Sequence, residues 1–251
     1  ELTTTGWELG IDWNHTFSNG IQFGVTAVFS DFKEEITKFA NTSKLLSNNF
    51  EGKTLGDIWG YETDRFFTRD DFMQDANGNL IIQNGRYVMK DGVATQKQWE
   101  ASWFFYGPGD VKYRDLNGDG VIDFGANSLD DHGDLRVIGN STPRYQYGFR
   151  LNASWKGFDV AVFIQGVGKR NLWPNGPLVI PGYRPGEAWY QHQLDYWTED
   201  NLDAFYPRPT DAGQSNNTRN FLPQTKYLLD LAYTLLKNVT VGYNLPVWLI
   251  K

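Results

Sequence analysis

The residues with the clearest chemical potential lie in a short acidic segment near the middle of the chain. Carboxylate and amide side chains recur there at the spacing of an EF-hand-type calcium loop: Asp115, Asn117, Asp119 and Asp123. Such a loop also takes a backbone carbonyl from its seventh position, here Val121, and needs glycine at its sixth, here Gly120. The spacing predicts a structural Ca²⁺ site that stiffens this segment.

This segment is incomplete as an EF-hand loop. The twelfth position of such a loop needs a bidentate carboxylate, and Ala126 stands there. An alternative without metal is therefore open, in which the segment is a turn stabilised by its own side-chain-to-backbone hydrogen bonds. A second segment of similar appearance, Asp-Ala-Asn-Gly-Asn at 75–79, has too few following carboxylates and is interpreted as a hairpin turn.

Catalytic chemistry has little support in the sequence. The absence of cysteine excludes a cysteine nucleophile and a thiolate metal site, and three scattered histidines do not suggest zinc. The sequence contains no Gly-x-Ser-x-Gly elbow, His-Glu-x-x-His helix or phosphate-binding glycine loop. With 23 basic and 30 acidic residues the net charge is −7, so electrostatic capture of nucleic acid is not expected. We expect neither an enzyme nor a nucleic-acid partner.

Aromatic side chains in the long segments between predicted strands are candidate ligand contacts. Trp59, Tyr61 and Trp103 could stack on sugar rings or peptide side chains at an outer surface. Packing within the loops is the alternative for each of them.

Composition indicates a sheet with two unlike faces. Aromatics make up 16% of the residues, yet the mean hydropathy is −0.50, and no apolar run approaches the roughly 18 residues that a membrane helix needs. Aromatic and apolar residues must therefore alternate with polar ones, as they do along amphipathic strands.

Period-two alternation appears in five segments. Trp7, Leu9, Ile11 and Trp13 are apolar while the residues between them are polar or glycine, and eight of the nine odd positions from 229 to 245 are apolar. The pattern predicts strands at about 2–17, 21–32, 145–155, 158–168 and 227–245. Each is long enough for a tilted strand to cross a bilayer.

Loop lengths favour a membrane barrel over a soluble sandwich. Turns of two or three residues alternate with excursions at about 33–144 and 169–226, which are too long for compact domains. Outer-membrane barrels have short periplasmic turns and long extracellular loops. The sequence therefore predicts an all-β, antiparallel transmembrane barrel that is only partial, because five strands cannot close one in lipid.

In this barrel the odd positions of the first three predicted strands and of the last one would face lipid. The polar residues between them would line the lumen: Asp12, Asn14, Gln146, Arg150, Asn152, Asp230, Asn238 and Asn244. A polar lining implies a wet or plugged interior.

Several motifs together resemble the SusC/RagA class of TonB-dependent outer-membrane transporters. They are Asp-Leu-Asn-Gly-Asp-Gly-Val-Ile-Asp at 115–123, Val-Ile-Gly-Asn at 137–140, Pro-Arg-Tyr at 143–145, Trp-Lys-Gly-Phe-Asp at 155–159, Gln-Gly-Val-Gly at 165–168, Leu-Gly-Asp-Ile-Trp-Gly-Tyr at 55–61, and the segment 236–246. In order and spacing they span nearly the whole chain. The class usually has an aspartate just before the Val-Ile-Gly stretch, and Asp134 stands there as the implied last calcium ligand, with Asp130 and Asp131 as competitors.

The resemblance implies that residues 1–251 are a C-terminal portion of a barrel of about 22 strands in the outer membrane of a Gram-negative cell. It implies import of oligosaccharides or peptides with a SusD-like surface lipoprotein, powered through TonB. The N-terminal plug domain, the TonB-contacting segment and most strands would lie outside these residues. The alternative from another class is a secreted calcium-binding β-sandwich, either a carbohydrate-binding or an adhesin module.

Overall fold

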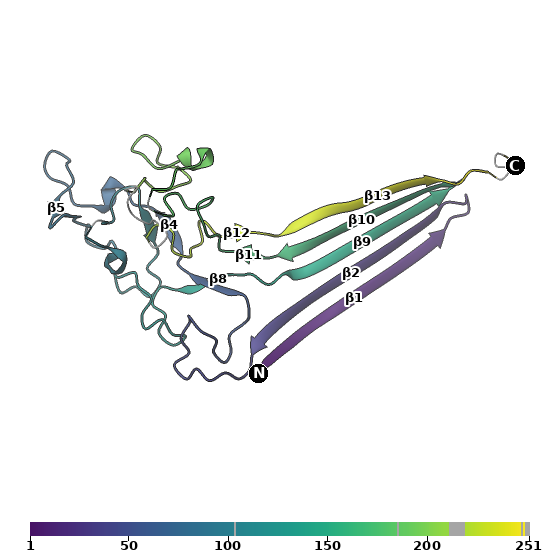
Figure 1. Ribbon diagram of the computed structural model, residues 1–251, viewed down its shortest axis with the longest axis horizontal. Helices are drawn as coiled ribbons and strands as arrows, with labels where there is room; N and C mark the ends of the chain where they lie inside the picture. The colour runs from purple at the N-terminus through teal and green to yellow at the C-terminus, as the bar shows by residue number, and fades with distance from the viewer. Residues whose placement is uncertain (103, 185, 211–218, 247, 249–251) are drawn as a thin grey trace.

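One long antiparallel sheet dominates the computed structural model, which describes residues 1–102, 104–184, 186–210, 219–246 and 248 (Figure 1). Its strands lie in the order β1-β2-β9-β10-β13. Their bounds are Leu2–Thr16 for β1, Gln22–Ile36 for β2, Arg144–Trp155 for β9, Phe158–Lys169 for β10 and Tyr233–Tyr243 for β13. The predicted all-β, antiparallel fold is confirmed, and the sheet is not closed into a barrel.

Tight turns join the strands at one end of the sheet. Between β1 and β2, the amide of Phe17 donates to the carbonyl of Ile21 at 2.8 Å. Between β9 and β10, Lys156 and Gly157 both have positive φ, which gives a two-residue turn the twist that antiparallel strands need. The long segments all leave from the opposite end (Figure 1).

The sheet has an apolar and a polar face. Residues directly paired across antiparallel strands share a face, so the pairs Ile11 with Ala27 and Val25 with Leu151 lie together on the apolar face. The turn end of this face carries aromatic pairs; the Phe158 and Tyr243 rings are 4.4 Å apart. Such a band of aromatic residues is typical of a membrane interface.

A β-bulge changes the assignment of faces on β13. Ile164 pairs with Leu236 but Phe163 pairs with Asn238, so Lys237 is the extra residue. Because an extra residue reverses the alternation beyond it, Leu235 shares the polar face of its partner Gln165. The expectation that every odd position from 229 to 245 faces lipid is wrong for the stretch before the bulge.

The last predicted strand also begins later than expected. Asp230 belongs to a separate two-residue strand, β12 (Leu229–Asp230), which pairs with β11 (Asn171–Leu172). Asn244 lies just past the end of β13. These two residues are therefore not part of the polar face of the main sheet.

Both long excursions contain short elements of their own. β2 continues to Ile36 because Phe32 to Ile36 stay paired with β1. Beyond it come β3 (Asp57–Gly60), β4 (Thr63–Phe66), β5 (Ile82–Gln83), β6 (Arg86–Tyr87), β7 (Val111–Tyr113), β8 (Arg136–Asn140) and the 3-10 helices η1 (Arg69–Asp71), η2 (Lys97–Trp99) and η3 (Gln191–Leu194). The short strands pair in twos: β3 with β8, β4 with β7 and β5 with β6.

The two excursions pack into one body, the loop unit, defined here as the described residues within 37–143 and 170–232. Its main core combines residues from both excursions, among them Tyr61, Tyr113, Trp197 and Phe221. A β-sandwich needs two packed sheets. The described strands outside the main sheet are only two to five residues long and pair in twos, so they do not form a second sheet of this kind. The described part of the chain contains no helix long and apolar enough to cross a membrane.

The bulge generates a test by single cysteines introduced into this chain, which has none of its own, in a full-length protein whose other parts are also free of cysteine. In lipid, a water-soluble thiol reagent should label Leu235→Cys and leave Val239→Cys unlabelled, since Leu235 pairs with Gln165 and Val239 with Val162. Both are odd positions, so uninterrupted alternation predicts equal labelling. Equal labelling of the two variants would contradict the bulge.

Candidate functional site

The predicted calcium loop is a series of turns closed by its own side chains. Asp115 accepts hydrogen bonds from the amides of Gly118 at 2.6 Å and Gly120 at 2.8 Å. Asn117 Oδ1 accepts from the Asp119 amide, and Asp119 Oδ1 accepts from the Val121 amide. This is the arrangement of the metal-free alternative, in which acidic side chains satisfy backbone donors.

Asp134 lies at the centre of this segment. Its side chain is fully buried and accepts from the amides of Leu116 at 2.7 Å and Asp123 at 2.9 Å. Burial raises the pKa of Asp134, although these amide hydrogen bonds act in the opposite direction. Asp134 therefore ties the two ends of the loop together, while its role as the last calcium ligand stays a prediction.

The acidic side chains of this segment do not gather into a metal-binding set. Among the residues that the structure describes, no three His, Cys, Asp or Glu side chains lie close enough to hold a metal ion. The carboxylates of Asp115, Asp119 and Asp123 accept amide hydrogen bonds, and a carboxylate has further lone pairs with which it can coordinate a cation. Calcium binding at this loop stays a prediction.

The predicted aromatic contacts have different environments. Tyr61 is only 3% exposed and packs against Trp99 and Tyr113, with ring centroids 5.1 and 5.2 Å away. Burial raises the pKa of its hydroxyl. Tyr61 is a core residue of the loop unit, because the hydrophobic effect favours burying so large a ring where two excursions meet.

Trp59 is partly exposed on β3, and its ring centroid lies 5.6 Å from that of His132. Its indole nitrogen is buried without a hydrogen-bond partner among the described residues. Trp103 lies outside the described residues. Ligand contact at Trp59 stays a prediction.

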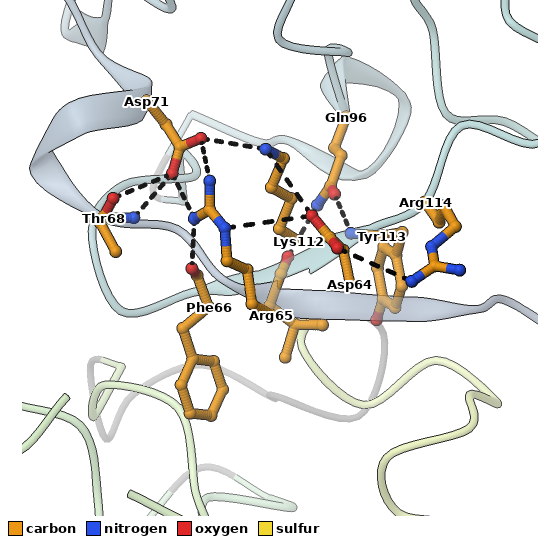
Figure 2. A network of polar contacts seen from close by, with 10 residues as sticks. Asp64, Arg65, Phe66, Thr68, Asp71, Gln96, Lys112, Tyr113 and Arg114 are labelled. Atoms are coloured by element: carbon orange, nitrogen blue, oxygen red, sulfur yellow. Dashed lines mark hydrogen bonds and ion pairs between the residues drawn. The ribbon is translucent and has the colours of Figure 1, made fainter. Parts of the chain in front are cut away.

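An ionic network that sequence reasoning did not find surrounds Asp71 (Figure 2). The Arg65 guanidinium donates two hydrogen bonds to the Asp71 carboxylate, at 2.6 and 2.7 Å, and Lys112 Nζ lies 3.0 Å from the same carboxylate. The Thr68 amide donates to it at 2.8 Å. Although burial alone would raise the pKa of Asp71, these hydrogen bonds hold it well below its usual range.

The network joins elements far apart in the sequence. Lys112 also lies 3.8 Å from Asp64, whose other oxygen is 3.9 Å from Arg114. Ion pairs thereby connect β4, β7 and η1 (Figure 2). Arg65 binds Asp71 and also lies 4.0 Å from Asp64; its spacing of six residues from Asp71 gave no periodic signal.

Two buried amide side chains connect the two excursions, and a third binds β7 from within the first excursion. This third one, Gln96, donates to the Val111 carbonyl of β7 at 3.0 Å and accepts from the Tyr113 amide at 2.7 Å. Asn220, from the other excursion, accepts from the Val111 amide at 2.9 Å, and Gln224 donates to the Tyr113 hydroxyl at 3.2 Å. Gln96 and Asn220 thereby replace a neighbour strand for β7 and satisfy its backbone groups in the interior.

Asp110 completes this buried set. It is fully buried and accepts from Arg208 at 2.7 Å, Asn220 at 2.9 Å and the Gly107 amide at 2.8 Å. Burial raises the pKa of Asp110 against the effect of these partners. Arg208 and Asn220 belong to the second excursion and Asp110 to the first, so these hydrogen bonds hold the two excursions together. Removing one partner would leave an uncompensated buried charge.

The polar face of the sheet is the second candidate functional surface. In its middle row, Asp12 pairs with Thr26 and Thr26 with Arg150, and the Thr26 hydroxyl donates to Asp12 at 2.6 Å. In the next row, Asn14 pairs with Gly24 and Gly24 with Asn152. The structure thus brings the predicted lumen residues of β1 and β9 onto one face. Of the predicted lumen residues near the C-terminal end, Asp230 and Asn244 lie outside this face.

Comparison with known proteins agrees with this architecture. No family model matches the chain. It is 24% identical over 260 residues to the TonB-dependent receptor P3 of Formosa agariphila, covering 98% of this chain and 22% of that protein. It is 31% identical over 140 residues to TonB-dependent receptor P26 of the same organism, covering 55% of this chain and 13% of that one.

Solved structures with the same fold include the RagAB peptide transporter. The TM-score is 0.62 at 19% identity, with 99% of this chain and 23% of the other covered. The RagAB peptide importer in its closed-closed state gives 0.58 at 19% identity, covering 100% and 24%. The expected similarity to TonB-dependent receptors is confirmed in sequence, and the expected similarity to the RagA barrel is confirmed in fold. The chain spans about a fifth of the length of these proteins.

The network around Asp71 generates a pH-dependent prediction. Because the pKa of Asp71 is lowered by folding, its contribution is present above the ordinary aspartate pKa and is lost as the pH falls toward the lowered value. Asp71→Asn should destabilise the loop unit by about 1–3 kcal/mol at neutral pH. Amide hydrogen exchange in β4 and β7 of the full-length protein measures this.

The matched control is Asp70→Asn, at the exposed neighbouring position, with an effect within about 0.5 kcal/mol. The difference in destabilisation between Asp71→Asn and Asp70→Asn should shrink below about pH 4. Equal destabilisation by both variants, or a gap that does not change with pH, would refute this role of Asp71.

The calcium prediction is tested by titration of the full-length protein. If the ion binds, Ca²⁺ should raise the thermal stability of the loop unit, and Asp119→Asn should remove the increase because it removes a charged ligand. Asn79→Ala, in the similar turn at 75–79, is the control and should keep the increase. An unchanged stability with Ca²⁺ in the native protein would leave only the metal-free turn.

Proposed function

We propose that this chain, a relative of the TonB-dependent receptors, is a late section of the barrel of an outer-membrane importer of SusC/RagA type. The observation that carries the proposal is the two-faced sheet with two open edges, in a sequence similar to such receptors over 98% of its length. The apolar face contacts lipid, the polar face lines the interior, and the loop unit lies outside the cell.

The open edges support the barrel. β1 and β13 each have one neighbour in the sheet, so alternate amides and carbonyls along their free sides need partners. In lipid such groups cannot remain unpaired. Strands elsewhere in the longer protein pair with both edges and complete the wall.

Import of oligosaccharides or peptides is the activity we propose for the whole protein. One solved neighbour is titled a peptide transporter, and the partly exposed Trp59 could contact either substrate. A SusD-like lipoprotein acts as the surface partner, and TonB supplies energy through the part of the protein that precedes this section.

A pair of adjacent residues tests the membrane wall. Val162 pairs with Leu151 on the apolar face, and Ala161 pairs with Asn152 on the polar face. In the full-length protein, Val162→Arg should destabilise the inserted barrel by about 2–4 kcal/mol because it places a cation in lipid. Ala161→Arg should leave insertion intact, as measured by the amount of folded protein in purified outer membranes.

Uptake is measured in the same cells with fluorescently labelled oligopeptides and oligosaccharides. Cells with the native protein should accumulate one of these pools only while the membrane is energised, and Val162→Arg should abolish this uptake. Equal insertion of both arginine variants would contradict the barrel, and unchanged uptake without the protein would contradict the transport activity.

A further inference from the structure

A hollow of about 470 Å³ lies on the polar face of the sheet. Three rows of paired residues surround it across β2, β9 and β10. The middle row is Val28, Gly148 and Gln165, so the central position of the patch is a glycine. The hollow exists because this position has no side chain.

The backbone at Gly148 is ordinary extended strand, so glycine is not needed there for conformation. A Cβ at this position would approach the ring of Phe163 at 3.5 Å, an ordinary contact distance. The Phe163 ring therefore flanks the hollow. A larger side chain at position 148 would fill it without straining the strand.

Arg150 is the charged residue that lines the hollow. Its guanidinium lies 5.8 Å from the centroid of the Phe163 ring, and among the described residues no carboxylate lies within ion-pair distance of it. Asp12, in the same row, is two strands away and is bound by Thr26. The positive charge of Arg150 is therefore available to a ligand.

The other polar groups that line the hollow are neutral. Ser30 supplies a hydroxyl, and Gln146 and Gln165 supply amides. An arginine recognises a carboxylate through paired, charge-assisted hydrogen bonds, while neutral amides and hydroxyls complete the coordination. Phe163 and Tyr233 add ring faces for the carbon skeleton of the ligand.

We propose that this hollow binds the carboxylate of a small solute as the solute passes along the barrel wall, with Arg150 as the anion-binding residue. This inference rests on the proposed function, because it requires the polar face to line a wet interior. The carboxylate is either the C-terminus of a peptide or the acid group of a sugar. One unpaired cation among neutral groups matches one negative charge.

The experiment is cysteine protection in the full-length protein in outer membranes. Ser30→Cys places a thiol in the hollow, and Ser154→Cys places one on the same face near the short turn, outside the hollow. A water-soluble methanethiosulfonate should modify both. N-acetyl-trialanine and glucuronate are the carboxylate probes, and N-acetyl-trialanine amide and glucose are their neutral counterparts.

A carboxylate probe should slow modification of Ser30→Cys and leave Ser154→Cys unaffected. Protection by the peptide acid alone identifies a peptide C-terminus, and protection by glucuronate alone identifies an acidic sugar. In the Ser30→Cys background, Arg150→Gln should raise the half-protecting concentration about tenfold or more. Gly148→Leu should abolish protection while Arg150 is retained.

Two results overturn the inference while the barrel stands: labelling of both cysteines without protection by any acid, or equal protection by neutral and acidic probes. Protection that is unchanged in Arg150→Gln also overturns it. Failure of the proposed function is distinguishable, because the inserted barrel predicts that Leu151→Cys on the lipid-facing apolar face stays unlabelled; a reactive Leu151→Cys, or unreactive Ser30→Cys and Ser154→Cys, would contradict the barrel itself.

Discussion

Backbone hydrogen bonding at the sheet edges is the constraint on which the rest of this structure depends. β1 presents fifteen residues with a neighbour on one side only, and β13 presents eleven. In water, solvent would satisfy these groups, but the apolar face with Ile11, Leu151 and Val239 is suited to lipid, which cannot. The sheet is therefore stable in its membrane only within a larger, closed array of strands.

The loop unit satisfies the same requirement by other means. Its strands are too short to pair on both sides, and amide side chains replace the missing neighbours: Gln96 and Asn220 bond the backbone of β7. Because Asn220 also bonds the buried Asp110, the two excursions form one body, and the charged network at the buried Asp71 belongs to it. This body is held at the end of the sheet from which the long segments leave (Figure 1).

Much of the sheet could be predicted from sequence because strand periodicity is local. Alternation from Trp7 to Trp13 and the short turn at Gly157 indicate strands and their polarity without any knowledge of partners. The bulge at Lys237 could not be assigned from sequence, since a bulge depends on register with β10. The break in alternation at Leu236 and Lys237 does not by itself distinguish a bulge from an isolated exception. Tyr61 was a candidate ligand contact for a similar reason, because burial under residues from a distant excursion has no local signature.

The candidate sites divide along the same line. The turn-forming pattern of Asp115 to Asp123 is local, and its hydrogen bonds are visible in the structure, whereas the convergence of ligands on an ion is not a property of spacing alone. Arg150 could be assigned to the interior by alternation. The hollow beside it required the register that places Gly148 between Val28 and Gln165.

The central claim is that both edges of this sheet are paired in the complete protein. Amide hydrogen exchange, resolved at individual residues of β1 in the full-length protein in lipid, tests this most directly. The account predicts that amides of β1 pointing away from β2 exchange as slowly as those bonded to β2, because a neighbouring strand protects them. Rapid exchange at these alternate positions, with slow exchange at the others, would contradict the closed barrel.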